Sequence, residues 1–538
     1  MLLNRTRSTT HLLMFIMTLG LLASSLGTAT AQTPVASPVA SPVAITPSYV
    51  EAECMYDLPD GLTEGENTFC GWVTAPMYSD GSGDDTVTLP VIRIASVNDN
   101  PEPEPLMILL GGPGQNMSAV LPMFSDDLPY WNFMLERQDV ILFDQRGMGL
   151  ATPTLACPFE RIGEDGQVSD ANIGFAILRC GAELQMEDVD VTAFTTQSNA
   201  ADIESIRIAM GYEQVNLYGI SYGSKLALSA IRDYPDSIRS TIIASPLPLE
   251  SNPFADQTLG FDNALSEVWT ACAADPVCAE ANPDPEAAYL QAVELLKTEP
   301  MTMTAINPAT GDSLELPIDN YQFMQILYLG VFVGDITPLL PYLVTSVAEG
   351  DDTYLQMFGP MIFAGGGLSN GALFTYFCQD EVPFSSQSDT AQIIGSADLS
   401  TPMTDGSWIS LGDQSDTICR MWNFPAADQI EAEAVVSDEP LLIMTGTFDP
   451  ITPASNGEIV QANFPNSQLV NFAAMGHDPA STVPECSGPI ILSFLDDPSA
   501  EVDGSCANAP VDFPTEEELD TVTATPAATP AIEPIGGV

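Results

Sequence analysis

The segment GISYG at residues 219–223 places Ser221 between two glycines, and this serine is the side chain best suited to act as a nucleophile. An apolar run, Val215–Tyr218, precedes the segment, and a helical pattern follows as far as Asp233. A nucleophile on a sharp strand-to-helix turn needs small neighbours, because the backbone brings flanking residues close to the serine. The turn also puts the serine at a helix N-terminus, where the dipole favours developing negative charge. The pattern therefore predicts a nucleophilic serine.

A serine hydroxyl becomes a good nucleophile only when a base removes its proton. The chain has two histidines, and His11 lies in the N-terminal segment interpreted below as an export signal. His477 comes shortly after the apolar run QLVNFAA, so a loop leaving a strand would present it at the carboxyl edge of a sheet. A lone surface histidine is the alternative interpretation. Together with the serine motif, this position favours His477 as the base.

A third group must orient the imidazole and stabilise its cationic form. Asp449 lies in LLIMTGTFDPITP, directly after an apolar strand pattern and next to prolines that stiffen the turn. Its position at a strand end selects it among many acidic residues. Asp478 is the competitor, but adjacent side chains rarely reach the ring nitrogen in the required geometry. The order Ser221, Asp449, His477 is the order found in α/β-hydrolases.

The oxyanion of an acyl-transfer reaction needs two backbone N–H donors. Tyr222, the residue after the serine, is expected to supply one. The loop GGPG at residues 111–114 ends an apolar run and is expected to supply the other, from Gly112 in preference to Gly111. A phosphate-binding loop is the rival interpretation, but the Gly-Lys-Ser/Thr of a P-loop does not follow.

Short apolar runs alternate with helical patterns, which predicts a mostly parallel sheet with helices on both faces. One helix is expected to start at an N-cap at Ser198 or Asn199 and to end at Gly211. The predicted strands are Val87–Ile94, Leu106–Leu110, Val140–Phe143, Val215–Tyr218, Thr241–Ala244, Leu441–Met444 and Leu469–Phe472.

The strand pattern stops near Ser245 and resumes near Leu441, a gap too long for a connecting loop. We therefore expect an inserted, mainly helical cap domain. Proline-rich, small-residue segments near both ends predict unpacked tethers. The expected parts are a signal peptide (1–31), a linker (32–49), the first part of the core (50–245), the cap (246–438), the C-terminal part of the core (439–510) and a disordered tail (511–538).

The N-terminus has the features of an export signal. Arg5 and Arg7 precede an apolar run, Leu12–Leu26, and a small-residue motif ends at Ala31. The apolar run is shorter than the roughly 20 residues of a spanning helix. We expect cleavage after Ala31 and a secreted, extracellular protein whose mature chain does not insert into a membrane.

The ten cysteines all follow the signal, and an even number in an oxidising compartment suggests up to five disulfides. Pairing between sequence neighbours is the simplest scheme, although the sequence does not fix the connectivity. No CxxC motif occurs and the mature chain has one histidine, so we expect no metal and no organic cofactor. The neighbouring pairs are Cys54–Cys70, Cys157–Cys180, Cys272–Cys278, Cys378–Cys419 and Cys486–Cys506.

Charge is the unusual bulk property, with 73 acidic residues against 13 basic ones and a formal net charge of -60. Only two of the basic residues are lysines, Lys225 and Lys297. Such a surface repels nucleic acid and anionic lipid, which argues against both as partners. A saline or acidic habitat and a solvated coat both account for the charge, and we favour the coat.

The motifs GGPG, DQRGMG (144–149), DIESIR (202–207) and GISYGS resemble the proline iminopeptidase and tripeptidyl aminopeptidase branch of the α/β-hydrolases. The later segments GTFDPITP and AAMGH are similar to the C-terminal part of the tripeptidyl aminopeptidases. The resemblance covers roughly residues 50–500. Proline iminopeptidases have a histidine before GGPG, where this chain has Leu110, and this departure favours the secreted tripeptidyl group over strict proline specificity.

The resemblance implies a serine exopeptidase that releases single residues or short peptides from free N-termini. A substrate amine needs a carboxylate partner, and Asp380 and Glu381 are expected to bind it, although a solvated acidic face is an equally good interpretation. Arg420 is a possible structural partner of one of them. Asp144 and Arg146, in the family's DQRG segment, are expected to form a buried pair that holds the loop.

Two alternatives remain open at this stage. A carboxylesterase uses the same scaffold and triad, and a catalytically silent extracellular binding protein would fit the proline-rich ends. We expect peptide substrates and a monomer.

Overall fold

The structure is a computed structural model, and it describes residues 45–126, 130–157, 170–187, 189–306, 313–334, 336–358, 368–397, 411–515 and 518–519. The expected signal peptide lies outside the described residues, and so does most of the expected linker. The last residues of that linker, from Ser48, form the start of a strand.

Nine strands of the described chain form one sheet in the order β1-β2-β3-β5-β4-β6-β7-β10-β11. The strands from β5 to β11 in this order run parallel, and the three at the other edge are antiparallel. Each predicted strand is present, whereas β1 and β2 were not predicted. The strands are β1 Ser48–Glu51, β2 Thr68–Pro76, β3 Thr86–Ile94, β4 Glu102–Leu109, β5 Gln138–Phe143, β6 Val215–Ile220, β7 Ile238–Ala244, β10 Leu441–Gly446 and β11 Ser467–Phe472.

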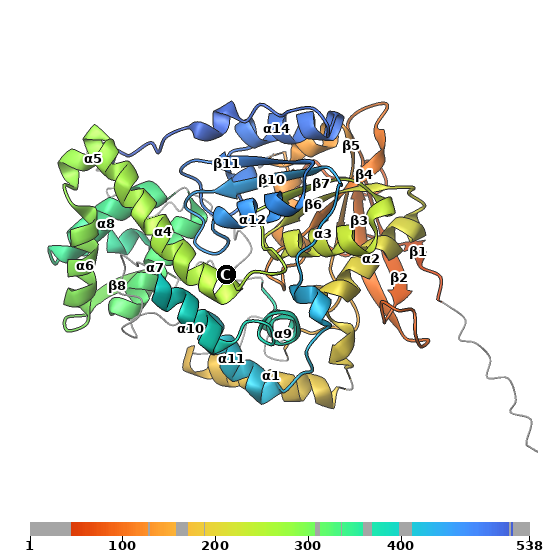
Figure 1. The fold of residues 1–538 in the computed structure, drawn as a ribbon, viewed down its shortest axis with the longest axis horizontal. Coiled ribbons are helices and arrows are strands. Elements are labelled where there is room, and N and C mark those ends of the chain that lie inside the picture. The colour runs from red at the N-terminus through yellow and green to blue at the C-terminus, as the bar shows by residue number, and fades with distance from the viewer. Residues whose placement is uncertain are drawn as a thin grey trace, which may run out of the picture. The chain divides into compact units, whose positions relative to one another are not determined.

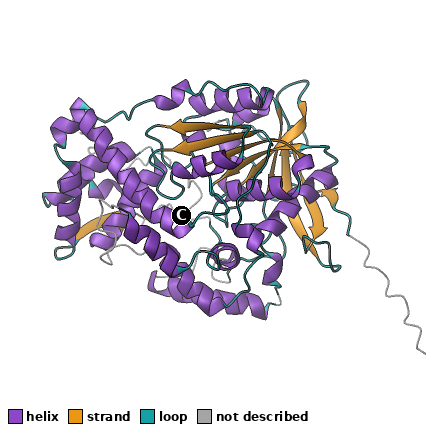
Figure 2. Ribbon diagram, viewed as in Figure 1, coloured by secondary structure: helices purple, strands orange, loops and turns teal. Residues whose placement is uncertain are grey.

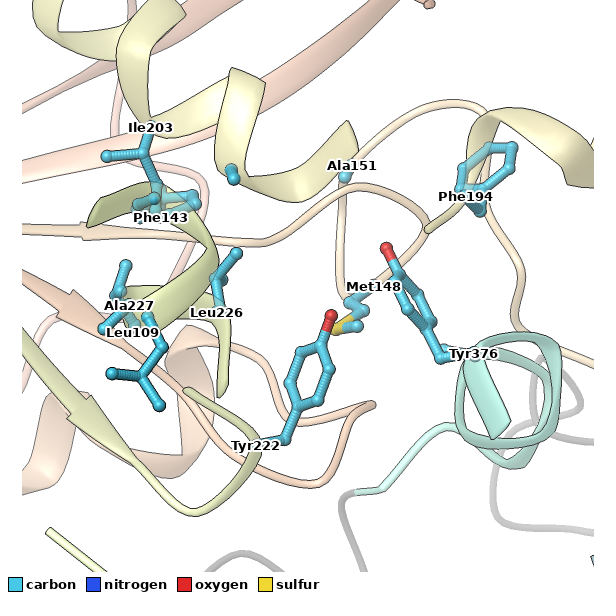
Figure 3. Packing of buried hydrophobic residues seen from close by; sticks show 14 of the residues in the cluster. Leu109, Phe143, Met148, Ala151, Phe194, Ile203, Tyr222, Leu226, Ala227 and Tyr376 are labelled. Carbon is cyan, nitrogen blue, oxygen red and sulfur yellow. The ribbon is translucent and has the colours of Figure 1, made fainter. Parts of the chain in front are cut away.

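The sheet separates two apolar cores, because successive strand residues point to opposite faces. In β4, Met107 and Leu109 belong to one core, and Leu106 and Ile108 belong to the other. Figure 2 shows helices on both sides of the strands. The first core holds α2 (Thr196–Met210) and α3 (Tyr222–Asp233), and the second holds α14 (Pro484–Asp496). Figure 3 shows part of the first core.

Helix α2 corrects one predicted boundary. Its N-cap is Thr195, whose side chain accepts a hydrogen bond from the backbone of Ser198, so the predicted cap residues Ser198 and Asn199 lie inside the helix. Threonine and serine are both favourable N-cap residues, which is why the sequence pattern did not separate them. The predicted end is confirmed, because Gly211 caps the helix with a φ of 81°.

Strands β7 and β10 are neighbours in the sheet, and the chain leaves it between them at residues 246–438, which we call the insertion. A third apolar core, with Phe261, Leu327 and Leu343, lies mostly within it and also includes Phe448 of the loop after β10. In Figure 1, α4 to α8 gather on the left, away from the sheet. The insertion comprises α4 Pro253–Ala274, α5 Pro276–Ala281, α6 Pro285–Leu296, β8 Met301–Ile306, β9 Ser313–Ile318, α7 Asn320–Val333, α8 Leu340–Ala348, α9 Asn370–Tyr376, the π-helical turn η8 Phe377–Glu381, α10 Gln387–Ser396 and α11 Leu411–Trp422.

Helix α1 (Asp170–Met186) precedes the insertion in the chain but packs on it, next to α9 and α11 (Figure 1). The indole N–H of Trp422 donates to the carbonyl of Ile177 at 3.1 Å. A segment that the sequence assigned to the first part of the core therefore supports the insertion.

All five neighbouring cysteine pairs are present as disulfides. In the described chain, helices that are both long and apolar enough to cross a bilayer do not occur. The first residues of the expected tail are packed: Phe513 and Leu519 are buried, and Tyr342 donates to the carbonyl of Pro514 at 2.8 Å. The remainder of that tail lies outside the described residues.

Candidate active site

Ser221 lies on the turn between β6 and α3, with a φ of 56° and a ψ of -123°, a strained conformation for a residue with a side chain. The flanking glycines are required by space. A Cβ on Gly219 would lie 2.3 Å from the carbonyl oxygen of Gly223, and a Cβ on Gly223 would lie 1.9 Å from that of Leu109. The turn is the sharp, exposed elbow that the motif predicts.

The GGPG loop leaves β4, the strand beside β6, and lies against this elbow. A Cβ built on Gly111 would lie 3.0 Å from the Cβ of Ser221. The N–H of Gly111 donates to the side chain of Gln115 at 3.0 Å, whereas no described hydrogen bond uses the N–H of Gly112. Gly112 also has a φ of 102°, which favours glycine. These contacts favour Gly112 over Gly111 as the second oxyanion donor beside Tyr222.

Asp449 follows β10 and is buried. Its Oδ1 accepts the N–H groups of Ile451 and Thr452, each at 2.9 Å, and its Oδ2 accepts the Thr452 hydroxyl at 2.8 Å. Burial alone raises the pKa of Asp449, but the charge and hydrogen bond of His477, with the bonds from Thr452, outweigh it and lower the pKa. The carboxylate is therefore held ionised and in one orientation.

His477 lies in the loop after β11, and its Nδ1 is 2.8 Å from Oδ2 of Asp449. The Thr452 hydroxyl is 3.3 Å from the same nitrogen. Burial lowers the pKa of His477, but the charge and hydrogen bond of Asp449 and the charge of Asp478 raise it above its ordinary value of 6.5. The side chain of Asp478, the competing acid, accepts hydrogen bonds from Ser481 at 2.5 Å and Tyr218 at 3.5 Å.

Strand β7 connects the serine turn with the histidine loop. The N–H of Ser221 donates to the carbonyl of Ala244 at 3.0 Å, and the hydroxyl of Ser245, the next residue, accepts the N–H of Asp478 at 2.9 Å. Among the described hydrogen bonds, none joins the Ser221 hydroxyl to His477 itself. Such bonds are commonly long in the absence of substrate and shorten when it binds.

Two supporting residues escaped the sequence analysis. Thr452 bonds to both Asp449 and His477, and Ser245 holds the histidine loop. Thr452 lies in the PITP segment after the aspartate, so its proximity in sequence was a usable signal. Ser245 is separated from the histidine by the whole insertion, and no local pattern marks it.

The DQRG segment is held by different pairs from those expected. Arg146 forms a buried, two-pronged ion pair with Asp202, with both N–O distances 2.7 Å. Asp144 accepts the hydroxyl of Tyr56 at 2.6 Å and the N–H groups of Met117 and Leu150. The expected pair of Asp144 with Arg146 is therefore wrong, because each side chain meets partners from other segments.

Asp380 and Glu381 lie in η8 and are both buried, with exposed fractions of 1% and 4%. Asp380 accepts the N–H and hydroxyl of Thr196 at 2.8 and 2.7 Å, and Glu381 forms an ion pair with Lys225 of α3. Because these partners come from the core and solvent is excluded, the two carboxylates are poorly placed to meet a substrate amine. We do not carry the amine-binding role forward.

The expected role of Arg420 is also wrong, because this side chain pairs with Asp416 of its own helix.

Burial and the nearby charge of Glu431 raise the pKa of Asp380 to about 8. No cluster of three metal-binding side chains occurs among the described residues.

Comparisons with known proteins agree with this architecture. A model of the α/β-hydrolase fold matches residues 104–276, and a model of TAP-like proteins matches residues 409–506. The serine protease Hip1 of Mycobacterium tuberculosis is 23% identical over 458 residues, which cover 79% of this chain and 84% of that protein.

Two further relatives match shorter segments. A tripeptidyl aminopeptidase of Streptomyces lividans is 28% identical over 200 residues, 35% of this chain and 36% of that protein. A probable proline iminopeptidase of Streptomyces coelicolor is 25% identical over 168 residues, 31% of this chain and 41% of that protein. With its mostly parallel sheet and both matches, the chain is a serine peptidase-like protein of the α/β-hydrolase fold with a TAP-like C-terminal segment.

Proposed function

We propose that the chain is a secreted serine exopeptidase that hydrolyses peptide bonds near free N-termini, with Ser221, Asp449 and His477 as its catalytic triad. The observation that carries the proposal is the contact of 2.8 Å between His477 and Asp449 at the sheet edge that also bears the Ser221 elbow. The relatives named as aminopeptidases support the choice of substrate. Five disulfides and the export signal in the sequence support secretion.

The reaction is acyl transfer. His477 takes the proton of the Ser221 hydroxyl, and the oxygen attacks the scissile carbonyl. The N–H groups of Tyr222 and Gly112 stabilise the oxyanion of the tetrahedral intermediate. His477 then donates its proton to the leaving amine, and water, activated by the same imidazole, hydrolyses the acyl-enzyme. Asp449 keeps Nδ1 protonated, so that Nε2 is the atom that accepts and returns the proton.

The insertion acts in this proposal as a cap that limits access to peptides with free N-termini. Its helices α4 and α7 border the loops that carry Asp449 and His477: a Cβ on Gly260 of α4 would lie 2.8 Å from the carbonyl of Pro450, and Phe332 of α7 contacts His477. A cap at this position covers the carboxyl edge of the sheet, where the substrate must bind.

The test compares peptide anilides with free N-termini, the same anilides with acetylated N-termini, and short nitrophenyl esters. We expect hydrolysis of the free peptides, with a much lower kcat/KM for the acetylated ones. Hydrolysis of the esters alone would contradict the peptidase assignment and identify a carboxylesterase. Mass spectrometry of the fragments released from a peptide library then gives the length of the product.

A fluorophosphonate probe separates an enzyme from a silent binding protein. The wild type is expected to become covalently labelled, and Ser221→Ala is expected to remain unlabelled while unfolding at the same temperature. If the wild-type protein is not labelled, the result would contradict the assignment of Ser221 as the catalytic nucleophile.

A further inference from the structure

The last turn of helix α7 lies directly against the histidine loop. The backbone N–H of His477 donates to the carbonyl oxygen of Phe332 at 3.1 Å. The ring of Phe332 also stacks on the imidazole, with 4.9 Å between the ring centroids and 23° between the planes. Both the backbone and the ring of the histidine therefore contact one residue of the insertion.

The residue before the histidine shows how close this approach is. A Cβ on Gly476 would lie 2.4 Å from the carbonyl oxygen of Val331 and 2.7 Å from that of Phe332. No side chain fits between the loop and the end of α7, because distances under 3.0 Å to backbone atoms require the backbone to move. The glycine in AAMGH thus permits the contact between the insertion and the loop.

The stacked ring restricts a motion that the triad hydrogen bond opposes at one atom only. The imidazole can tilt by rotation about its Cβ–Cγ bond, and the bond from Nδ1 to Asp449 holds a single ring atom against this rotation. A flat aromatic surface stacked on one face blocks tilting toward that side and thereby helps to fix the direction of Nε2. Reaction rates depend steeply on such alignment, since a displacement of about 1 Å can cost roughly 100-fold.

We propose that Phe332 is a positioning residue that fixes the imidazole of His477 and makes the insertion part of the catalytic support. The proposal rests on the proposed function, in which His477 is the base. Phe332 meets no reacting atom in this scheme and acts only through the histidine.

The rest of the insertion is consistent with this role. Helix α4 also approaches the acid loop closely, with a Cβ on Gly260 placed 2.8 Å from the carbonyl of Pro450 and 3.3 Å from that of Asp449. Tyr328, one turn before Phe332 on α7, is buried, and this burial raises the pKa of its hydroxyl, with a smaller contribution from the charge of Asp449. Two helices of the insertion thus border two of the three triad loops.

The experiment uses the full-length protein with Phe332→Leu, which removes the ring, and Phe332→Tyr, which keeps it. The matched control is Phe323→Leu on the same helix, because Phe323 is fully buried and none of the described ring contacts joins it to His477. Each variant is measured for the rate of fluorophosphonate labelling, for kcat and KM on a free peptide anilide, and for thermal unfolding.

We expect Phe332→Leu to lower the labelling rate and kcat by about 10-fold or more, with KM nearly unchanged, because alignment rather than binding is lost. Phe332→Tyr should restore most of the rate. Phe323→Leu should lower the unfolding temperature yet label as fast as the wild type. A purely structural role for Phe332 would instead give the two leucine variants the same behaviour.

A labelling rate of Phe332→Leu equal to that of the wild type would overturn the inference and leave the proposed function intact. A wild type that resists labelling would contradict the proposed function first. If Phe332→Leu does not fold, Gly476→Ala provides the second test, because its added Cβ separates the loop from α7. Gly476→Ala is expected to slow labelling, and an unchanged rate would again overturn the inference.

Discussion

The serine turn and the histidine loop reach the same edge of the sheet but are held in different ways. Ser221 is fixed by the backbone of its strand-turn-helix unit and of the neighbouring strands, because a Cβ on Gly219 would meet Gly223 and a Cβ on Gly223 would meet Leu109 of β4. His477 is fixed from outside, by Asp449, by the Ser245 hydroxyl and by Phe332 of the insertion. The serine turn is therefore recognisable in a short sequence, whereas the support of the histidine depends on segments far apart in the chain.

The largest expected effect comes from disrupting the serine turn with Gly223→Ala. The added Cβ would lie 1.9 Å from the carbonyl oxygen of Leu109, so the nucleophile must move by more than about 1 Å, and labelling should fall by roughly 100-fold or more. The control is Gly211→Ala, where a Cβ meets no atom within 4 Å. An alanine at the positive φ of Gly211 costs about 1 kcal/mol of stability, and this variant should label at the wild-type rate. Equal rates for the two variants would contradict the steric account.

The insertion also reaches the serine helix, through the buried ion pair of Glu381 with Lys225. Glu381→Gln removes the only carboxylate that forms an ion pair with Lys225 among the described contacts and leaves the weaker charge interactions with Asp380 and Glu431, so the free energy of unfolding should fall by about 3 kcal/mol in urea titrations. Removing both charges, in Lys225→Met with Glu381→Leu, should recover much of the loss. Glu183→Gln, which removes the more exposed pair with Arg179, should cost under about 1 kcal/mol. A similarly small loss in Glu381→Gln would show that the pair does not tie the insertion to α3.

The support of the histidine can be weakened at Thr452. Thr452→Val removes the hydroxyl that bonds to Asp449 at 2.8 Å and lies 3.3 Å from His477. A lost hydrogen bond to a charged group is worth about 2 kcal/mol, so kcat should fall by roughly 30-fold. Thr452→Ser should restore the rate. Thr445→Val removes another buried hydroxyl, bonded to Asn471, and should leave kcat unchanged. A comparable loss in both valine variants would assign the effect to stability alone.

The smallest expected effect is a shift of the pH profile. Asp449 and Asp478 together raise the pKa of His477 above 6.5, and the base must be neutral to act, so the acid limb of kcat/KM should have its midpoint above that value. Asp478→Asn keeps the shape of the side chain and removes one negative charge, which should move the midpoint to lower pH. Asp497→Asn, a change at an exposed carboxylate, is the control and should leave it in place. If the midpoint does not move in Asp478→Asn, the charge of Asp478 does not raise the pKa of His477.

The sequence predicted what depends on local patterns. Each predicted strand is present: six belong to the parallel part of the sheet, where buried strands are near-continuous apolar runs, and β3 of the antiparallel edge is also rich in apolar residues. The five disulfides join sequence neighbours, so proximity along the chain was sufficient to pair them. Strands β1 and β2 were missed because they lie at the antiparallel edge, where polar residues interrupt the apolar pattern.

The partners of buried charges could not be predicted. Arg146 pairs with Asp202 and Glu381 pairs with Lys225, and each pair joins segments that become neighbours only in the folded chain. The sequence instead suggested a pair of Asp144 with Arg146 in DQRG. It also suggested amine binding by Asp380 and Glu381, with Arg420 as a partner of one of them. With 73 acidic residues in the chain, charge type alone cannot identify a carboxylate's partner.

The burial of Lys225 has a practical consequence for chemical modification. The chain has two lysines, and the side chain of Lys225 is fully buried, whereas that of Lys297 is one-third exposed. Apart from the terminal amine, an amine-reactive dye will therefore attach to the folded enzyme at a single lysine. A second dye molecule on Lys225 will report exposure of this buried amine, so mass spectrometry of dye incorporation over time measures how often the contact between the insertion and the serine helix is broken.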